Sequence, residues 1–197
     1  MGCWRDRWQD QQMPFCIVQL ANYDGRQQTG MPRPIAYPEE PVNSSWAQLR
    51  EAQRTTAKAD AFAELAVIND LGETVDIHPL RKKEVAERIG LCFDRLVFKN
   101  TKVKLSPEVI SADFIDGKVV LTLDQPVQSG PLQEFEIAGE NGKFVNAEAT
   151  ADGNKIEVKV AANSPLKVRY AWKDDPKAPV RSLTGLPMSS FEININK

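Results

Sequence analysis

Hydrophobic and polar residues follow two different periods along this chain, and the change falls near residue 100. Before it, 14–21 (PFCIVQLA) and 63–70 (AELAVIND) are short, mostly apolar runs, as is typical of strands buried on both faces of a sheet. After it, apolar and polar residues alternate, for example in 154–160 and 166–172. Alternation predicts strands with one face in a core and the other in water. The chain is therefore expected to change architecture at this point.

A helix is predicted after each of these two apolar runs. The first helix is predicted at 44–57. Ser45 can cap its start, and Gln48 can return a hydrogen bond to the cap. The second helix is indicated by apolar residues at helical spacing: Val85, Ile89, Cys92 and Leu96. We expect a solvated face from the charged residues of this helix: Arg81, Lys82, Lys83, Glu84, Glu87 and Arg88. The order strand, helix, strand, helix predicts parallel strands with crossover helices.

The alternating half contains further strand candidates at 117–123 and 134–139, and two hairpin signals. Asn-Gly at 141–142 and Asp-Gly at 152–153 stand between strand-like runs, which is the strongest short signal for a hairpin. This half is predicted to be a small antiparallel β domain resembling a sandwich. We accordingly divide the chain into an α/β part, 1–99, and an antiparallel β domain, 100–197.

Charge and hydropathy exclude two kinds of partner. The formal net charge of −2 and the pI near 5.6 argue against nucleic acid, since phosphate binding requires a basic surface. No run of 18 apolar residues occurs, so no membrane span is expected. The first residues, MGCWRDRWQDQQ, also lack the apolar stretch of a signal peptide, and the chain as it stands is not expected to be exported.

The three cysteines form neither a metal-binding pair nor a disulfide-rich pattern. Cys16 falls in an apolar strand and Cys92 on an apolar helix face, so we expect structural thiols rather than nucleophiles. One histidine and scattered carboxylates do not make a metal site. No metal and no cofactor is therefore predicted.

The histidine itself, His78, is the strongest candidate for chemistry. It follows a predicted strand, where open α/β sheets place their sites, and Asp76 precedes it by two positions. In an extended segment the two side chains point the same way, and a carboxylate there can orient an imidazole that takes a proton from a serine. Two alternatives stay open. His78 can simply pack at a helix start, and Asp70, directly after the strand, rivals Asp76 for the acid.

Six segments in order resemble one family: PFCIVQLANY, WAQLREAQ, DLGETVDIHPLRKKEVAERIG, FEIAGENGKFVNAEA, VRYAWKDDP and GLPMSSFEI. They are similar to the bacterial sialate O-acetylesterases, which are SGNH-type serine esterases. The resemblance implies that 1–99 is the C-terminal part of an SGNH-like catalytic domain with a parallel sheet. It implies that His78 is the catalytic base, Asp76 its acid, and an O-acetylated sialic acid or related sugar the substrate. Residues 21–25 would lie near the pocket rim, but no substrate-binding residue is assigned. The resemblance also implies a periplasmic or secreted full-length protein.

The chain departs from that family at the nucleophile. The family's Gly-Gln-Ser-Asn block and its oxyanion-hole residues have no counterpart here, and none of the nine serines stands in such a context. Ser44 and Ser45 are better explained by helix capping. We therefore expect a fragment or subunit with the Asp/His half of a triad, inactive alone. Its expected partner is the missing N-terminal portion of the catalytic domain or an oligomeric copy.

A second function class is a remnant without catalysis whose β domain binds glycan or protein. Such a module should present an exposed aromatic platform, and Tyr170 and Trp172 are the candidates. Both fall on the apolar side of their strand by parity, so a place in the core is favoured for each.

Overall fold

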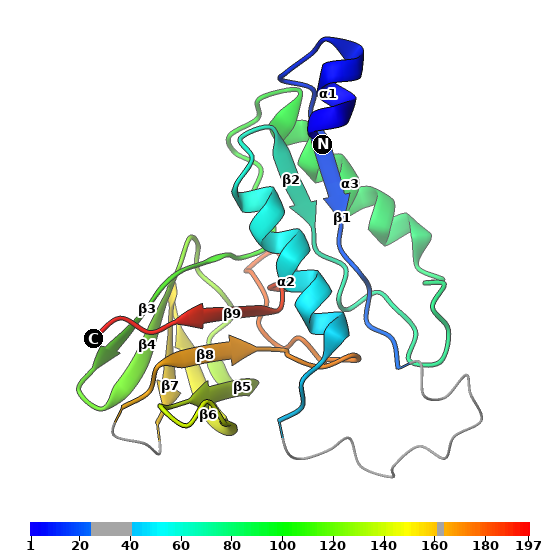
Figure 1. Cartoon of the computed structure of the whole chain (residues 1–197). Helices are drawn as coiled ribbons and strands as arrows, with labels where there is room; N and C mark the ends of the chain where they lie inside the picture. The colour runs from blue at the N-terminus through cyan, green and yellow to red at the C-terminus, as the bar shows by residue number, and fades with distance from the viewer. Residues whose placement is uncertain (25–40, 161–163) are drawn as a thin grey trace.

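The structure is a computed structural model that describes residues 1–24, 41–160 and 164–197 (Figure 1). The first half contains α1 (Gly2–Trp8), β1 (Phe15–Val18), α2 (Ser45–Lys58), β2 (Ala63–Ala66) and α3 (Lys82–Leu96). The second half contains β3 (Val109–Ile115), β4 (Lys118–Leu123), β5 (Gly130–Ala138), β6 (Phe144–Asp152), β7 (Lys155–Lys159), β8 (Lys167–Tyr170) and β9 (Phe191–Asn194). No helix in the described part of the chain is long and apolar enough to cross a bilayer.

The two strands of the first half pair in parallel, as their order with the helices predicted. The register runs from Phe15 opposite Ala63 to Val18 opposite Ala66. Helix α2 packs against β2, and α3 packs against both strands (Figure 1). Both strands end earlier than the apolar runs that predicted them, because the chain turns into loops directly after Val18 and Ala66.

A small apolar cluster holds α3 to this sheet. Its buried members are Ala66, Cys92 and Leu105, and the half-buried Cys16 and Ile89 pack against them. Contact with the Cys16 thiol and burial raise the pKa of Cys92 far above that of a free thiol. A thiol held protonated behaves as an apolar side chain, in keeping with the structural role expected of it.

The start of α2 corrects one expectation. Ser44, not Ser45, is the N-cap: its backbone is still extended, and its Oγ accepts a hydrogen bond of 2.9 Å from the Ala47 amide. Gln48 does not return a bond to the cap, because its side chain donates to Asn43 Oδ1 at 2.9 Å. The predicted helix is present, but it is capped one residue earlier.

The seven strands of the second half form one antiparallel sheet in the order β3-β4-β7-β6-β5-β8-β9. The sheet curls until its ends meet: the Phe114 amide donates to Asn196 O at 2.9 Å, and the Asn196 amide donates to Ala112 O at 2.8 Å. The result is nearly a barrel, whose two halves enclose one core as a sandwich does. The predicted antiparallel β domain is thus confirmed.

The Asp-Gly hairpin signal marks a true turn. Asp152 pairs with Lys155 across a two-residue loop, in which Gly153 has a φ of 58°. A positive φ at this position is what glycine allows at low cost in a tight hairpin. The Asn-Gly signal lies in the loop that joins β5 to β6, between the paired Ala138 and Phe144.

Aromatic side chains fill the centre of the β domain. The ring of Tyr170 lies 4.8 Å from that of Phe135 and 5.9 Å from that of Phe191, centroid to centroid. Tyr170 is fully buried and Trp172 almost so. The predicted place of these two residues in the core is confirmed, and neither offers a surface platform for a sugar.

Candidate functional site

The Asp76–His78 pair lies in an irregular segment between β2 and α3. One carboxylate oxygen of Asp76, Oδ1, accepts a hydrogen bond of 2.8 Å from the His78 amide and lies 3.1 Å from the ring nitrogen Nδ1. A carboxylate that bonds to the backbone two residues on makes a turn. The segment is therefore bent rather than extended, and the side chains meet because of the turn rather than because of strand parity.

The pair is open to solvent. The His78 side chain is 83% exposed and that of Asp76 50% exposed. The hydrogen bonds from the His78 amide and ring lower the pKa of Asp76, which keeps the carboxylate ionised. An ionised acceptor at Nδ1 favours the tautomer that carries its proton there, leaving Nε2 as the free base. The apolar side chains around the pair are exposed as well: Val75, Ile77 and Leu80.

The rival acid, Asp70, is engaged elsewhere. Its carboxylate forms ion pairs of 2.5 Å with Arg88 of α3 and with Arg181 of the β domain. Burial alone would raise the pKa of Asp70, but the two guanidinium groups outweigh it and lower the pKa. Asp70 therefore fastens the β domain to α3, and the carboxylate beside the imidazole is that of Asp76.

Arg88 departs from the solvated face predicted for α3. Its guanidinium turns inward and donates to the Val67 carbonyl at 2.7 Å as well as to Asp70. The other charged residues of that face are exposed or half-buried: Arg81, Lys82, Lys83, Glu84 and Glu87. The carboxylate and carbonyl at the end of β2 lie under the helix and attract this one arginine.

A network of polar contacts grips the segment just before Asp76. Asp175, in the loop after β8, accepts hydrogen bonds from Asn22 Nδ2 at 2.7 Å and from Thr74 Oγ1 at 2.8 Å. Asn22 Oδ1 in turn accepts from the Gly72 amide at 2.7 Å, and the Asp24 amide donates to Thr74 O at 2.9 Å. We call Asn22, Gly72, Thr74 and Asp175 the polar clasp.

The clasp was missed by sequence reasoning, which placed 21–25 only near a pocket rim. Asn22 to Asp24 do approach the histidine segment, through Gly72 and Thr74, whereas Gly25 lies outside the described residues. The one local signal was Gly72. A Cβ there would stand 2.0 Å from the Asn22 carbonyl oxygen, so only glycine fits against that strand end.

None of the nine serines, all of which the structure describes, hydrogen bonds to His78. Several have other tasks. Ser44 caps α2 and donates to Asp174, Ser189 bonds to Gln19, and Ser190 donates to Ala171 O. Within the described residues no group of three or more His, Cys, Asp or Glu side chains is arranged to hold a metal ion.

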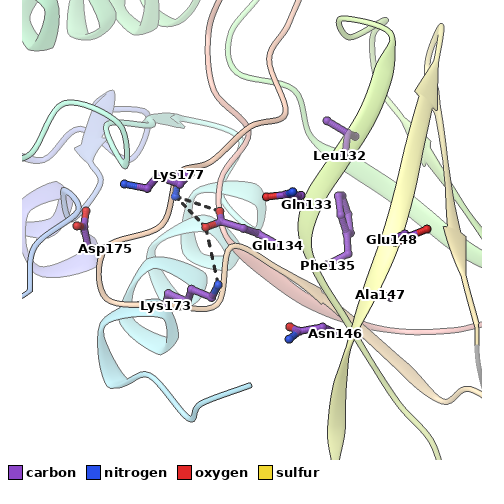
Figure 2. A pocket seen from close by; sticks show the side chains of 10 residues that line it. All are labelled: Leu132, Gln133, Glu134, Phe135, Asn146, Ala147, Glu148, Lys173, Asp175 and Lys177. Atoms are coloured by element: carbon purple, nitrogen blue, oxygen red, sulfur yellow. Dashed lines mark hydrogen bonds and ion pairs between the residues drawn. The ribbon is translucent and has the colours of Figure 1, made fainter. Parts of the chain in front are cut away.

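A hollow of about 620 Å³ lies on the β domain, beside the loop that carries Asp175 (Figure 2). Strands β5 and β6 and the loop after β8 supply its lining: Leu132, Gln133, Glu134, Phe135, Asn146, Ala147, Glu148, Lys173, Asp175 and Lys177. Glu134 is tied into this wall, since its carboxylate accepts from the Lys177 and Ala178 amides. Neither His78 nor Asp76 lines this hollow.

No family model matches this chain, and no curated protein matches it either. Among solved structures, the fold is matched by that of a carbohydrate esterase. The match is the crystal structure of a novel carbohydrate acetylesterase from Xanthomonas citri, with a TM-score of 0.80 and 33% sequence identity. The alignment covers 97% of this chain and 43% of that one, so this chain spans less than half the length of that enzyme. The name of that enzyme specifies acetylated carbohydrate and no particular sugar.

Proposed function

We propose that this chain carries the acid–base half of a carbohydrate esterase that removes O-acetyl groups from sialic acids. The observation that supports it best is the Asp76–His78 hydrogen bond, in a fold shared with a carbohydrate acetylesterase. The parallel strands and helices before residue 100 then belong to an SGNH-like catalytic domain. The order of six segments that resemble sialate O-acetylesterases is the reason to name sialic acid as the sugar.

In this proposal His78 works as the general base. Asp76 holds the ring through Nδ1, so that Nε2 takes the proton of a serine hydroxyl as the oxygen attacks the acetyl carbonyl. The same nitrogen then returns the proton to the sugar oxygen as the ester bond breaks. The ionised Asp76 stabilises the imidazolium between these steps. A water molecule, activated by His78 in the same way, releases acetate from the serine.

The serine and the oxyanion donors of this mechanism lie on a further segment or subunit. His78 has no hydrogen bond to a serine within the described residues, and its side chain is turned to solvent. A histidine–aspartate pair alone gives water only general-base help. Removing one oxyanion donor typically lowers kcat about a hundred- to a thousandfold, and members of a triad act as a unit. We therefore expect this chain alone to be without esterase activity.

Acetate release from O-acetylated sialic acid and from p-nitrophenyl acetate tests the proposal. The chain alone and its His78→Ala variant should release acetate at the same rate. Joining the chain to the remaining part of the catalytic domain, fused or as a separate chain, should give turnover that His78→Ala abolishes. Turnover by the chain alone that depends on His78 would mean that one of its serines is the nucleophile. A joined form that stays inert on both esters would contradict the esterase proposal itself.

A second candidate is a glycan-binding β module, and the hollow beside β5 and β6 favours it. Gln133, Asn146 and Lys177 bring amide and ammonium donors to an opening of about 620 Å³, which suits a sugar ring. The burial of Tyr170 and Trp172 speaks against it. Titration calorimetry with sialic acid, on the chain and on an Asn146→Ala variant, separates the two candidates. Binding that needs Asn146, in a protein whose joined form is inert, would favour the module.

A further inference from the structure

Asp175 joins two loops that begin at the same edge of the parallel sheet. It comes from the β domain and is buried, with 6% of its surface exposed. One carboxylate oxygen, Oδ1, accepts a hydrogen bond from Asn22 Nδ2 in the loop after β1. The other, Oδ2, accepts one from Thr74 Oγ1 in the loop after β2. A buried carboxylate that accepts a separate donor on each oxygen fixes both loops relative to its own strand.

The grip on the histidine segment is closest at Gly72 and Thr74. Asn22 holds the Gly72 amide and stands too close for any larger residue at that position. Thr74 is held twice, by its hydroxyl to Asp175 and by its carbonyl to the Asp24 amide. Asp76 follows only two residues later, so the clasp sets the direction in which the chain enters the turn.

Beyond Thr74 the support is thin. In the part of the chain that the structure describes, the side chains of Asp76 and His78 hydrogen bond to each other and are largely exposed. Their apolar neighbours Val75 and Ile77 are about half exposed and pack only in part against the protein. The orientation of the imidazole therefore depends on the fixed residues just upstream.

We infer that Asp175 is a positioning residue for His78, acting from the β domain through Thr74. Its effect on turnover rests on the proposed esterase function, but its effect on the imidazole does not. The β domain is then a brace for the acid–base pair rather than an independent appendage. Loss of the Asp175–Thr74 bond frees the turn, and the imidazole leaves Asp76 for part of the time.

The test uses the fact that His78 is the one histidine of the chain, so that its ring gives unambiguous NMR signals. Thr74→Val removes the hydroxyl while keeping the shape, Thr74→Ser restores it, and Asp175→Asn weakens the acceptor. Asp174→Asn is the matched control: it makes the same charge change in the same loop, on a carboxylate that bonds to Ser44 instead. For each protein, the ratio of the two neutral ring tautomers and the hydrogen-exchange rate of the His78 amide are measured, together with the unfolding midpoint.

Wild type, Thr74→Ser and Asp174→Asn should share an excess of the tautomer protonated at Nδ1. Thr74→Val and Asp175→Asn should reduce that excess and speed exchange of the His78 amide by about tenfold, the effect of losing one hydrogen bond to a charged group. Thr74→Val and Thr74→Ser should have the same unfolding midpoint. A change in the tautomer ratio and exchange rate of Thr74→Val then reports on positioning of the imidazole and not on a general loss of stability.

In the joined form that the esterase proposal requires, Thr74→Val should lower kcat by about tenfold with KM unchanged, since a displaced base weakens the chemical step rather than binding. If the joined form is inert, the esterase proposal fails, while the tautomer ratio still decides the role of Asp175. The inference is overturned if Thr74→Val and Asp175→Asn keep the wild-type ratio and exchange rate. It is equally overturned if Asp174→Asn changes them as much, or if Thr74→Ser does not restore them.

Discussion

The antiparallel domain and the parallel layer belong to one chain but contain cores of very different size. Among the described residues, one cluster of 20 buried apolar side chains fills the curled sheet, whereas the cluster between the parallel strands and α3 has three buried members. The histidine stands on the side with the smaller core. The candidate base, His78, thus stands where apolar packing contributes least.

Polar contacts compensate for part of this difference in apolar packing, because they join the parallel layer to the β domain. Asp70 pairs with Arg181, and Asn69 Nδ2 donates to Met188 O at 3.0 Å. Arg50 of α2, fully buried, donates to the Asp174 carbonyl at 3.3 Å. Several of these contacts come from the loops at the carboxyl ends of β1 and β2, which is also where an α/β sheet places its site. The larger core therefore supports the loops of the smaller one.

The same substitution made in each core should show the difference most clearly. Leu121, in β4, is fully buried in the large cluster, and Leu105, one of the three buried members of the small cluster, is 9% exposed. We expect Leu121→Ala to lower the free energy of unfolding by about 4 kcal/mol and Leu105→Ala by about 2 kcal/mol, the upper and lower parts of the range for buried leucine. Urea unfolding followed by circular dichroism measures both. Equal losses would mean that the parallel layer is as tightly packed as the β domain.

Removing the ion pairs between the two parts should have the next largest effect. Asp70→Ala leaves Arg88 and the partly buried Arg181 without their shared carboxylate, which we expect to lower the free energy of unfolding by about 2–3 kcal/mol. Glu87→Ala, on the exposed face of α3, is the control, and its loss should stay within about 1 kcal/mol. If both variants unfold at the same urea concentration, Asp70 does not fasten the two parts together.

The smallest effect concerns the Asp76–His78 pair, whose carboxylate is half exposed. The lowered pKa of Asp76 means that its hydrogen bonds to His78 are fully present above the ordinary carboxyl range, and are lost as the pH falls through the lowered value. The backbone donor contributes most to this shift, so His78→Ala should raise the pKa of Asp76 only part of the way to its ordinary value. NMR titration of the Asp76 carboxyl carbon measures both. A pKa fully restored in His78→Ala would assign the shift to the ring alone.

Local patterns in the sequence predicted most of the fold. Alternating residues in 154–160 and the Asp-Gly turn before them correctly predicted an antiparallel hairpin, because strand parity and turn chemistry act over a few residues. The order of elements correctly predicted the parallel pair of β1 and β2. The cap of α2 was misplaced by one residue, since Ser44 and Ser45 are equally suited by type and only the backbone angles distinguish them.

The surroundings of the candidate site were beyond such patterns. The spacing of Asp76 and His78 brought that pair to attention, and their hydrogen bond is present in the structure. Asp70 forms an ion pair with Arg181, which lies 111 residues further along the chain. The bond of Thr74 to Asp175 spans 101 residues. Contacts at such separations depend on how the two parts dock, and no local period encodes that.

The span between Thr74 and Asp175 also sets an order of events during synthesis. Chains leave the ribosome from the N-terminus, and domains generally fold as units in that order. The histidine segment therefore emerges about 100 residues before the carboxylate that holds it, and β5, the neighbour of β8 in the sheet, must form before the loop after β8 can take its place. Because contacts between distant residues form late, the bond between Thr74 and Asp175 closes only when the β domain is complete. A nascent chain that stalls before that point lacks the carboxylate of Asp175, and Thr74 is then held only through its backbone carbonyl.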